Sequence, residues 1–334
     1  MRPADTSRTA SSAEHGHSAV TDLPERRMLL DTAGLYFRAF YGVPDTMRAP
    51  NGMPVNAVRG LLDMIARLAS EFKPTEIVAC WDDDWRPQWR VDLIPTYKSH
   101  RVAQAAPTDA DPSIEDVPDL LTPQVAVIRE VLGALGIPVI GAAHHEADDV
   151  LGSLASNAVM PVDVVTGDRD LFQLIDDSRE VRVIYTGRGM SRLEILTDAA
   201  LETKYGVAPT QYADFAAMRG DASDGLPGVA GVGEKTAVAL LSRYGNLDSI
   251  VAAAADPASD MAASARAKVR AAADYLTVAP AVVNVVRTLA MPEFDARIRA
   301  STPAQAAELD RLCATWGLES SMHRARTALA TRAG

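Results

Sequence analysis

The stretch MLLDTAGLYFRAFYG, residues 28–42, joins a short apolar run to a helical pattern through an aspartate. The apolar run at 27–30 has the length and composition of a buried strand, and Asp31 follows it directly. Many GTPases also have the sequence Asp-Thr-Ala-Gly after an apolar run, in their second switch region. The aspartate of that sequence lies on the side of the magnesium ion. The stretch therefore predicts a strand that delivers a carboxylate, either in a nucleotide switch or in another kind of site.

The same alternation of apolar runs and helical patterns continues to about residue 200. Strands separated by helices predict an α/β fold with a mainly parallel sheet flanked by helices on both faces. No convincing strand follows residue 205, and the Ala-rich tail from 252 is helical in pattern. The other predicted strands are 76–81, 137–140, 162–166 and 181–185, and the clearest helices are 57–72, 122–136 and 148–158.

Two segments do not follow this alternation. Residues 83–121 are rich in Asp, Pro, Arg and Trp, and they predict a long excursion over one edge of the sheet. Loops of that length are usually functional. Residues 1–26 are polar and lack the apolar core of a signal peptide, so we expect a disordered N-terminal extension there.

Composition limits the class of protein. A chain of 334 residues, 48% of them hydrophobic, predicts a globular protein with two domains or one domain and a large appendage. Its two cysteines, Cys80 and Cys313, indicate neither a disulfide framework nor a zinc site. No apolar run reaches membrane-spanning length, so we expect no membrane partner and a cytoplasmic location. The formal net charge of −11 argues mildly against a bare nucleic-acid-binding surface.

Carboxylates follow several of the predicted strands. Asp31, Asp82 and the pair Asp168 and Asp170 come after strands whose carboxyl ends meet at one edge of a parallel sheet, where such sheets bind ligands. A single Asp after a strand is usually a turn or N-cap residue, but convergence of several strand ends is a different observation. The full set is Asp31, Asp82, Glu146, Asp148, Asp149, Asp168, Asp170, Asp221 and Asp224.

Nine carboxylates crowded together predict a metal site. Like charges at one sheet edge repel strongly unless cations lie among them. Ligands that are all oxygen select hard ions, Mg²⁺ or Mn²⁺. Two such ions can clamp a phosphodiester, so phosphoryl hydrolysis is the natural chemistry. Setting the nine charges aside brings the formal net charge from −11 to −2, which leaves room for basic patches elsewhere.

Six motifs in order along residues 27–290 then resemble one family, the 5′-nuclease or flap endonuclease superfamily. The likeness is greatest to the 5′-nuclease domain of bacterial DNA polymerase I and its stand-alone relatives. The motifs are LLDTAGLYFRAFYG, NGMPVNAVRGLL, WDDDWRPQWRVDLIPTYKSHR, HEADDVLGSLA, VVTGDRDLFQLI and MRGDASDGLPGVAGVGEKTAVALL. The resemblance implies a PIN-like sheet with a helical arch, a helix-three-turn-helix element and, because the chain ends at Gly334, a free-standing nuclease.

The resemblance also implies roles for particular residues. Asp31, Asp82, Glu146 and Asp148 correspond to a first metal site; Asp148, Asp149, Asp168, Asp170, Asp221 and Asp224 correspond to the second. In the arch base, Lys98 and Arg101 would meet the scissile phosphate and the threaded 5′ strand, and Tyr97 would stack on a base. Arg38 would support the phosphate from the other side.

GVAGVGEKT, residues 228–236, is close to a phosphate-binding loop with one residue too many before the lysine. A P-loop follows a buried strand and precedes the Asp-Thr-Ala-Gly motif, and neither holds here, so we expect no nucleotide cofactor. The stretch resembles the family's helix-hairpin-helix, in which a K⁺ often binds the hairpin carbonyls. The implied DNA-binding residues are Gly228, Gly231, Gly233, Lys235 and Thr236, besides Tyr97.

The predicted organisation is an extension at 1–26, a nuclease domain at 27–204 with its arch at about 83–121, and a helical domain at 205–334. The hairpin element lies at about 218–245. The resemblance implies a monomer near the nucleoid that acts in replication and repair on DNA 5′ ends, flaps, nicks or gaps. Two alternatives remain open: a non-hydrolysing DNA-structure binder and an RNA-directed PIN-like ribonuclease.

The chain departs from the family pattern at a few positions. Thr32 stands where a glycine is usual, and Gly225 stands where an asparagine is usual. One extra residue before Arg90 leaves open whether Arg86 or Arg90 works at the arch base.

Overall fold

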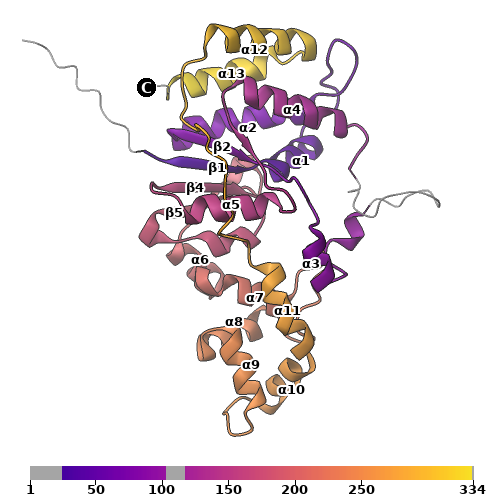
Figure 1. Ribbon diagram of the computed structural model, residues 1–334, viewed down its shortest axis with the longest axis vertical. Coiled ribbons are helices and arrows are strands. Elements are labelled where there is room, and N and C mark those ends of the chain that lie inside the picture. The colour runs from indigo at the N-terminus through magenta and orange to yellow at the C-terminus, as the bar shows by residue number, and fades with distance from the viewer. Residues whose placement is uncertain (1–24, 103–116, 333–334) are drawn as a thin grey trace, which may run out of the picture.

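The computed structural model of the protein describes residues 25–102 and 117–332 (Figure 1). Most of the predicted N-terminal extension and the middle of the predicted arch therefore lie outside the described residues. Glu25 and Arg26, at the end of that extension, are joined to the folded part by ion pairs of 2.8 Å to Arg297 and Asp163.

A six-stranded sheet with the order β3-β2-β1-β4-β5-β6 forms the centre of the molecule. The first five strands are parallel, as predicted, and β6 pairs antiparallel with β5. A three-residue edge strand carries too short a pattern to be recognised in sequence, so β6 was not expected. The strands are β1 Arg27–Asp31, β2 Glu76–Cys80, β3 Val139–Ile140, β4 Val162–Thr166, β5 Val181–Tyr185 and β6 Glu194–Leu196.

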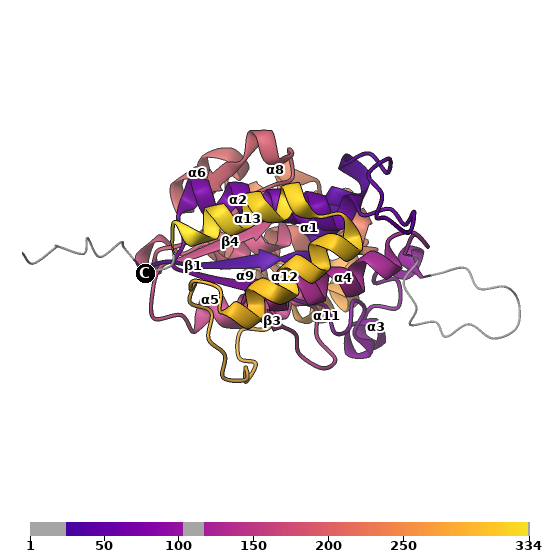
Figure 2. The ribbon, with the colours of Figure 1, turned by 90° about the horizontal axis from the view of Figure 1, so that it is seen from above.

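Helices cover both faces of the sheet, as Figures 1 and 2 show. Successive residues of β1 alternate between the two hydrophobic cores: Leu29 contributes to one, and Met28 and Leu30 to the other. Helix α5 (Ala147–Ser156) packs in the first core. Helices α1 (Thr32–Gly42), α2 (Asn56–Phe72) and α4 (Thr122–Ala134) pack in the second.

Apart from α3 (Gln88–Leu93), the remaining helices form two groups at opposite ends of the long axis (Figure 1). One group extends from the sheet toward the hairpin. It comprises α6 Asp198–Tyr205, α7 Tyr212–Arg219, α8 Glu234–Tyr244, α9 Leu247–Ala255, α10 Ala263–Ala271 and α11 Ala273–Val283. The other group comprises α12 Pro303–Trp316 and α13 Glu319–Ala330.

The last two helices do not join the helical domain expected at 205–334. Helix α13 packs along α2, and α12 packs on α4. The small side chains Ala325 and Ala328 are buried on the inner face of α13, which permits this close approach. The chain therefore returns past the sheet after α11, and its C-terminal helices form an outer layer of the sheet domain (Figure 2).

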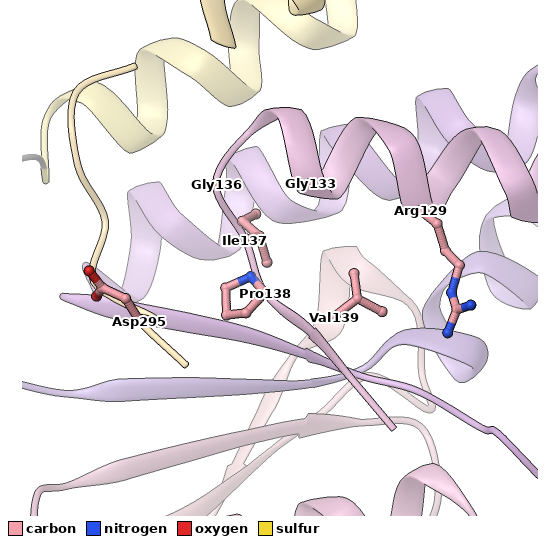
Figure 3. Close-up of a pocket in the computed structure, with 7 residues that line it drawn as sticks. All are labelled: Arg129, Gly133, Gly136, Ile137, Pro138, Val139 and Asp295. Carbon is pink, nitrogen blue, oxygen red and sulfur yellow. The ribbon is translucent and has the colours of Figure 1, made fainter. Parts of the chain in front are cut away.

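A hollow of about 550 Å³ lies beside the edge strand β3 and helix α4 (Figure 3). Arg129 lies at one end of it and Asp295 at the other, with Ile137, Pro138 and Val139 between them. None of the nine candidate carboxylates lines this hollow. The candidate site lies instead at the carboxyl ends of the central strands.

Candidate active site

The candidate carboxylates gather where the sheet changes direction. From β1 the chain moves outward to β2 and β3, and then crosses back to β4 on the other side of β1. The carboxyl ends of β1 and β4 therefore border a topological switch point, which is where open α/β sheets bind ligands. A cavity of about 150 Å³ opens there. Its lining includes Asp31, Asp82, Lys98, Arg101, Glu146, Asp148 and Asp168.

Asp31 ends β1 and caps helix α1. Its Oδ1 accepts a hydrogen bond of 2.9 Å from the Gly34 amide, and its Oδ2 accepts one of 2.8 Å from the Thr166 hydroxyl. A Cβ on Gly34 would lie 2.9 Å from the carboxyl carbon of Asp31, so only glycine leaves room for this carboxylate. The Asp-Thr-Ala-Gly sequence is thus an N-cap that presents a carboxylate to the cavity, and Thr32 is buried behind it.

Asp82 and Asp148 approach the same cavity from β2 and α5. Asp82 Oδ1 accepts a hydrogen bond of 2.7 Å from the Ala147 amide, which belongs to the first turn of α5. The unpaired N–H groups and the dipole of that turn favour negative charge. Asp148, the next residue, also lines the cavity. The N-terminus of α5 therefore favours the negative charge of two carboxylates, one from the segment after β2 and one from α5 itself.

Burial raises the pKa values of these carboxyl groups. The pKa of Asp82 rises to about 7 and that of Asp168 to about 6, mainly because burial penalises the charged form. Burial also raises the pKa of Asp31, and it raises that of Asp148 well above the usual range, with Asp168 and Asp31 adding like charge. Because burial makes the ionised form of these carboxyl groups unfavourable, any cation that enters the cavity stabilises that form.

A second set of carboxylates adjoins the cavity beyond Asp168. The Asp170 amide donates to Asp168 Oδ1 at 2.9 Å. Burial raises the pKa of Asp170 well above its usual range, and the charges of Asp168, Asp224 and Asp221 add to the effect. Asp170 Oδ1 is buried without a hydrogen-bond partner among the described residues. An acceptor left this way is a candidate ligand for a cation.

Two residues of the predicted arch base, Tyr97 and Lys98, form hydrogen bonds to Glu146. Its Oε2 accepts a hydrogen bond of 2.7 Å from Lys98 Nζ, and its Oε1 accepts one of 2.8 Å from the Tyr97 hydroxyl. The resemblance implied that Tyr97 stacks on a base, but Tyr97 is buried and its ring is not presented to solvent. Its side chain instead packs in the core and orients Glu146.

Asp149 faces away from the cavity. Its two oxygens accept hydrogen bonds of 2.7 and 2.9 Å from the Arg90 guanidinium, and Oδ1 also accepts one of 2.8 Å from the Val286 amide. Both side chains are almost fully buried. Consecutive residues of a helix point about 100° apart, so Asp148 and Asp149 cannot share one direction. We therefore leave Asp149, which the sequence analysis placed among the metal ligands, out of the proposed ligand set.

Arg90 connects three parts of the fold. It lies on α3 (Gln88–Leu93), binds Asp149 on α5, and donates to the Val282 carbonyl at the end of α11 at 3.2 Å. Arg86 donates instead to the Tyr97 carbonyl at 2.6 Å, and neither arginine lines the cavity. Both brace the arch base. The resemblance singled out Arg86 and Arg90, but a polar segment without periodicity gave no sign that Arg90 is buried.

Arg101 and Asp224 form the rim of the cavity on the side of the helical region. Arg101 Nη2 donates to Asp224 Oδ1 at 2.9 Å and to the Ser223 carbonyl at 2.7 Å. Asp221 caps the same short turn and forms an ion pair of 3.3 Å with Arg219. These two carboxylates are thus held by arginines.

Arg38 lies on α1 above Gly167. A Cβ on Gly167 would lie 2.9 Å from Arg38 Nη2 and 3.3 Å from the Thr186 hydroxyl. Arg38 Nε and Thr186 Oγ1 are both buried without a hydrogen-bond partner in the described part of the chain. The Arg38 guanidinium therefore has an N–H group that could donate a hydrogen bond to a ligand beside the carboxyl end of β4.

The hairpin at 228–233 connects α7 to α8 and follows no strand, which excludes a P-loop. Gly233 is the N-cap of α8, and Gly231, Gly233 and Lys235 are exposed there. Lys268 of α10 donates from Nζ to the Gly231 carbonyl at 2.8 Å. An ammonium group thus already occupies one of the hairpin carbonyls on which the resemblance places K⁺.

No metal-binding group stands ready-made in this arrangement. Within residues 25–102 and 117–332, no three His, Cys, Asp or Glu side chains converge closely enough to hold an ion as they stand. Several of the carboxylates accept hydrogen bonds from the protein instead, as Asp31, Asp82 and Glu146 do. Ion binding would exchange some of these hydrogen bonds for metal contacts. The donor set itself, all oxygen and mostly buried, fits a hard divalent cation.

This site and fold define a class, the 5′ nucleases built on a PIN-like sheet with a helical DNA-binding region. Two family models together match residues 26–306: "5'-3' exonuclease, N-terminal resolvase-like domain" matches 26–206, and "5'-3' exonuclease, C-terminal SAM fold" matches 207–306. The chain belongs to the 5′-3′ exonuclease family, as its motifs indicated.

Curated relatives agree with this assignment. The chain is 53% identical to a 5′-3′ exonuclease of Streptomyces coelicolor, an alignment that covers 90% of this chain and 99% of the relative. It is 48% identical to a 5′-3′ exonuclease of Mycobacterium tuberculosis, over 92% of this chain and 98% of that one. It is also 42% identical to DNA polymerase I of M. tuberculosis, over 67% of this chain but only 24% of the polymerase.

Solved structures share the fold. A T5 5′-exonuclease with zinc ions bound has a TM-score of 0.61 at 16% identity and covers 93% of this chain and 100% of its own. Human GEN1 in complex with Holliday junction DNA has a TM-score of 0.61 at 15% identity and covers 92% of this chain and 72% of its own.

Among the described residues, no helix is both long and apolar enough to span a membrane.

Proposed function

We propose that this family member is a divalent-metal-dependent 5′ nuclease that hydrolyses phosphodiesters of DNA as a 5′-3′ exonuclease and a 5′-flap endonuclease. One observation carries the proposal. Buried carboxylates with raised pKa values meet two basic residues of the arch base, Lys98 and Arg101, in a single cavity at the switch point. A phosphodiester needs cations on its oxygens, and the cavity has both carboxylates for metal ions and basic side chains of its own.

Mg²⁺ or Mn²⁺ are the ions that these ligands suit. When bound, two such ions supply Lewis-acid stabilisation of the charge on the phosphate and lower the pKa of a water. Asp148 is close enough to both sets to feel the charges of Asp31 and Asp168, so we assign it to both ions. The proposed ligands are Asp31, Asp82, Glu146 and Asp148 for one ion, and Asp148, Asp168, Asp170, Asp221 and Asp224 for the other, some of them through water.

The basic side chains bind and orient the substrate phosphate. Lys98 Nζ, now on Glu146, is a point charge in the cavity that can bind a phosphate oxygen as negative charge grows there. Arg101 can offer its planar guanidinium to the same strand. Arg38 has a free donor on the opposite side, beside Gly167. These three residues orient the phosphate and neutralise its charge.

The hairpin binds the duplex. Exposed backbone N–H groups at the N-terminus of α8 suit a DNA phosphate, and Gly228, Gly231, Gly233, Lys235 and Thr236 form this surface. A K⁺ there would compete with the ammonium of Lys268 for the Gly231 carbonyl. We therefore assign no role in hydrolysis to K⁺.

The arch base supports selection of 5′ ends. The turn Ser99–Arg101 stands at the cavity, where Lys98 and Arg101 are among the lining residues. Residues 103–116, the middle of the predicted arch, lie outside the described residues. An arch over the cavity would admit a threaded 5′ strand and reject DNA without a free 5′ end. We propose 5′ ends, flaps, nicks and gaps as substrates, acted on by a monomer near the nucleoid in replication and repair.

One assay tests the proposal and its two alternatives. Labelled 5′-flap, nicked and blunt duplex DNA, and a single-stranded RNA, are incubated with wild type and Asp148→Asn in Mg²⁺, Mn²⁺ or EDTA. We expect the wild type to cut flap and nicked DNA only with a divalent ion, and Asp148→Asn to bind without cutting. Binding without cleavage by the wild type would indicate a DNA-structure binder, and preferred cleavage of the RNA would indicate a ribonuclease.

A further inference from the structure

The arch base is joined to the loop that carries Asp221 and Asp224 by hydrogen bonds to backbone carbonyls of that loop. The Thr96 hydroxyl donates to the Gly225 carbonyl at 2.7 Å, and the Lys98 amide donates to the Asp224 carbonyl at 2.9 Å. We call this contact between residues 96–98 and 224–225 the latch. It joins segments more than a hundred residues apart in sequence, and it lies directly under two proposed phosphate-binding side chains.

The latch requires glycine at position 225 for two separate reasons. Gly225 has φ +69°, a left-handed conformation that most side chains avoid. Its position also has no room, since a Cβ would overlap the Thr96 carbonyl oxygen and lie 2.9 Å from the carbonyl carbon. Asparagine, the residue usual here in the family that the sequence resembles, tolerates the first condition but not the second. The close backbone approach is thus what excludes asparagine.

The latch also supports a strained backbone at Lys98. Lys98 has φ +49°, which costs a non-glycine residue on the order of 1 kcal/mol unless its surroundings fix it. Its amide is bonded to Asp224, and its Nζ reaches Glu146 at 2.7 Å. The residue is 8% exposed, so its side chain has little freedom. Strain of this kind at a substrate-facing residue indicates that its orientation is being imposed.

We propose that Thr96 and Gly225 are positioning residues that set the orientation of Lys98, and with it that of Arg101, in the cavity. This inference rests on the proposed function. The residues do not touch the substrate. They act by holding the turn 96–98 against the Asp221–Asp224 loop, so that the basic and acidic parts of the site keep a fixed spacing. A misplacement of about 1 Å in such a site lowers turnover about a hundredfold.

Two matched pairs of variants test the latch. Gly225→Asn is compared with Gly317→Asn, because Gly317 has φ +64° but only ordinary contacts of 3.6 Å or more around a Cβ. Thr96→Val, which loses the hydroxyl, is compared with Thr96→Ser, which keeps it. We expect kcat on a 5′-flap to fall about 10- to 100-fold in Gly225→Asn and about 3- to 10-fold in Thr96→Val, with KM changed less than about threefold. The two partner variants should stay within twofold of wild type.

A double variant shows whether the effect passes through Lys98. Lys98→Ala with Gly225→Asn should lose clearly less activity than the product of the two single losses, since a Lys98 side chain that is absent cannot be misplaced. Multiplied losses, or equal rates for Gly225→Asn and Gly317→Asn, would overturn the inference. If Gly225→Asn does not fold, the comparison of Thr96→Val with Thr96→Ser still tests the inference.

A measurement without catalysis separates the latch from the proposed function. Hydrogen exchange of the peptide segment around residues 94–102 should quicken at least tenfold in Gly225→Asn and not in Gly317→Asn, because the Lys98 amide loses its acceptor. Unchanged exchange refutes the latch even if the enzyme is active. A wild type that cleaves none of the DNA substrates but shows the exchange difference refutes the proposed function alone.

Discussion

The carboxylates at the floor of the cavity differ from those at its rim in what balances their charge. The floor consists of Asp31, Asp82, Asp148 and Asp168, none of which forms an ion pair among the described residues. We call the paired carboxylates around the floor the rim: Glu146 pairs with Lys98, Asp224 with Arg101 and, facing away from the cavity, Asp149 with Arg90. The charges at the rim are already paired within the protein, whereas the floor accumulates negative charge that an added cation would neutralise.

The difference separates stability from function within one acidic cluster. Breaking a buried ion pair by removing one partner leaves an uncompensated charge and costs several kcal/mol of stability. Removing a carboxylate from the floor relieves like-charge repulsion and the cost of burial, as the raised pKa values of Asp82 and Asp148 indicate. A substitution that damages catalysis at the floor should therefore preserve the fold, and the reverse should hold for Arg90 and Asp149.

The largest effect is expected for Asp148→Asn. Loss of this carboxylate should lower kcat on a 5′-flap at least about a thousandfold, because it removes a ligand assigned to both ions. The unfolding temperature in EDTA at pH 8 should stay the same or rise. Steady-state kinetics and thermal unfolding measure the two quantities.

Asp163→Asn is the matched control. Asp163 is also fully buried, but it lies in β4 and pairs with Arg26 and Arg182 at 2.8 and 2.7 Å. This variant should lose stability and keep its turnover. Comparable turnover in Asp148→Asn and wild type would show that the floor of the cavity is not the metal site.

The next effect is on stability. Arg90→Met leaves Asp149 buried without its partner, so the free energy of unfolding should fall by roughly 3–5 kcal/mol. Arg129→Met is the control, because Arg129 is half exposed and its ion pair with Asp83 spans 3.6 Å. Denaturant titrations of both variants in EDTA measure the difference. A loss below about 1 kcal/mol for Arg90→Met would show that this buried ion pair contributes little to stability, and would remove the difference between rim and floor.

A smaller effect is expected from pH. Folding raises the pKa of Asp82 from 3.8 to about 7, so the folded state binds its proton more tightly than the unfolded chain does. The resulting stability is present below pH 3.8 and is lost as pH rises toward about 7. The metal-free protein should therefore become less stable from pH 5 to pH 8, and Mg²⁺ should raise the unfolding temperature more at pH 8.

Thermal unfolding at several pH values, with Mg²⁺ or EDTA, checks this dependence. Asp82→Asn should reduce both the pH dependence and the gain from Mg²⁺. An equal Mg²⁺ effect at pH 5 and pH 8 would contradict the assignment of these carboxyl groups as ligands.

The sequence predicted the floor of the site better than its rim. An acid that directly follows a strand is a local pattern, and parallel strands bring such acids together whatever lies between them, as they do for Asp31 and Asp168. The rim depends on contacts between distant segments. Tyr97 and Arg90 lie in a polar stretch whose pattern gives no hint of burial, and Asp149 could be separated from Asp148 only by asking which way each faces on the helix.

The same limit applies to the fold. Five parallel strands and their helices were predicted because each has its own periodicity. The three-residue strand β6 was too short to detect. The packing of α13 on α2 could not be predicted either, because an amphipathic helix shows that it has a buried face but not which element covers that face.

The smallest effect is expected at the hairpin, a third region for which we propose a role in binding alone. Gly233→Val should weaken binding of a 5′-flap about tenfold, because a side chain at the N-cap of α8 blocks the approach of a phosphate to the backbone. The fold should tolerate it, since the backbone there is extended and a Cβ meets no atom within 4 Å. Gly133→Val, on α4 and equally open, is the control and should bind normally. Titrations in Ca²⁺ and kcat at saturating DNA separate the two roles: a lowered kcat with unchanged affinity would assign the hairpin to catalysis instead of binding.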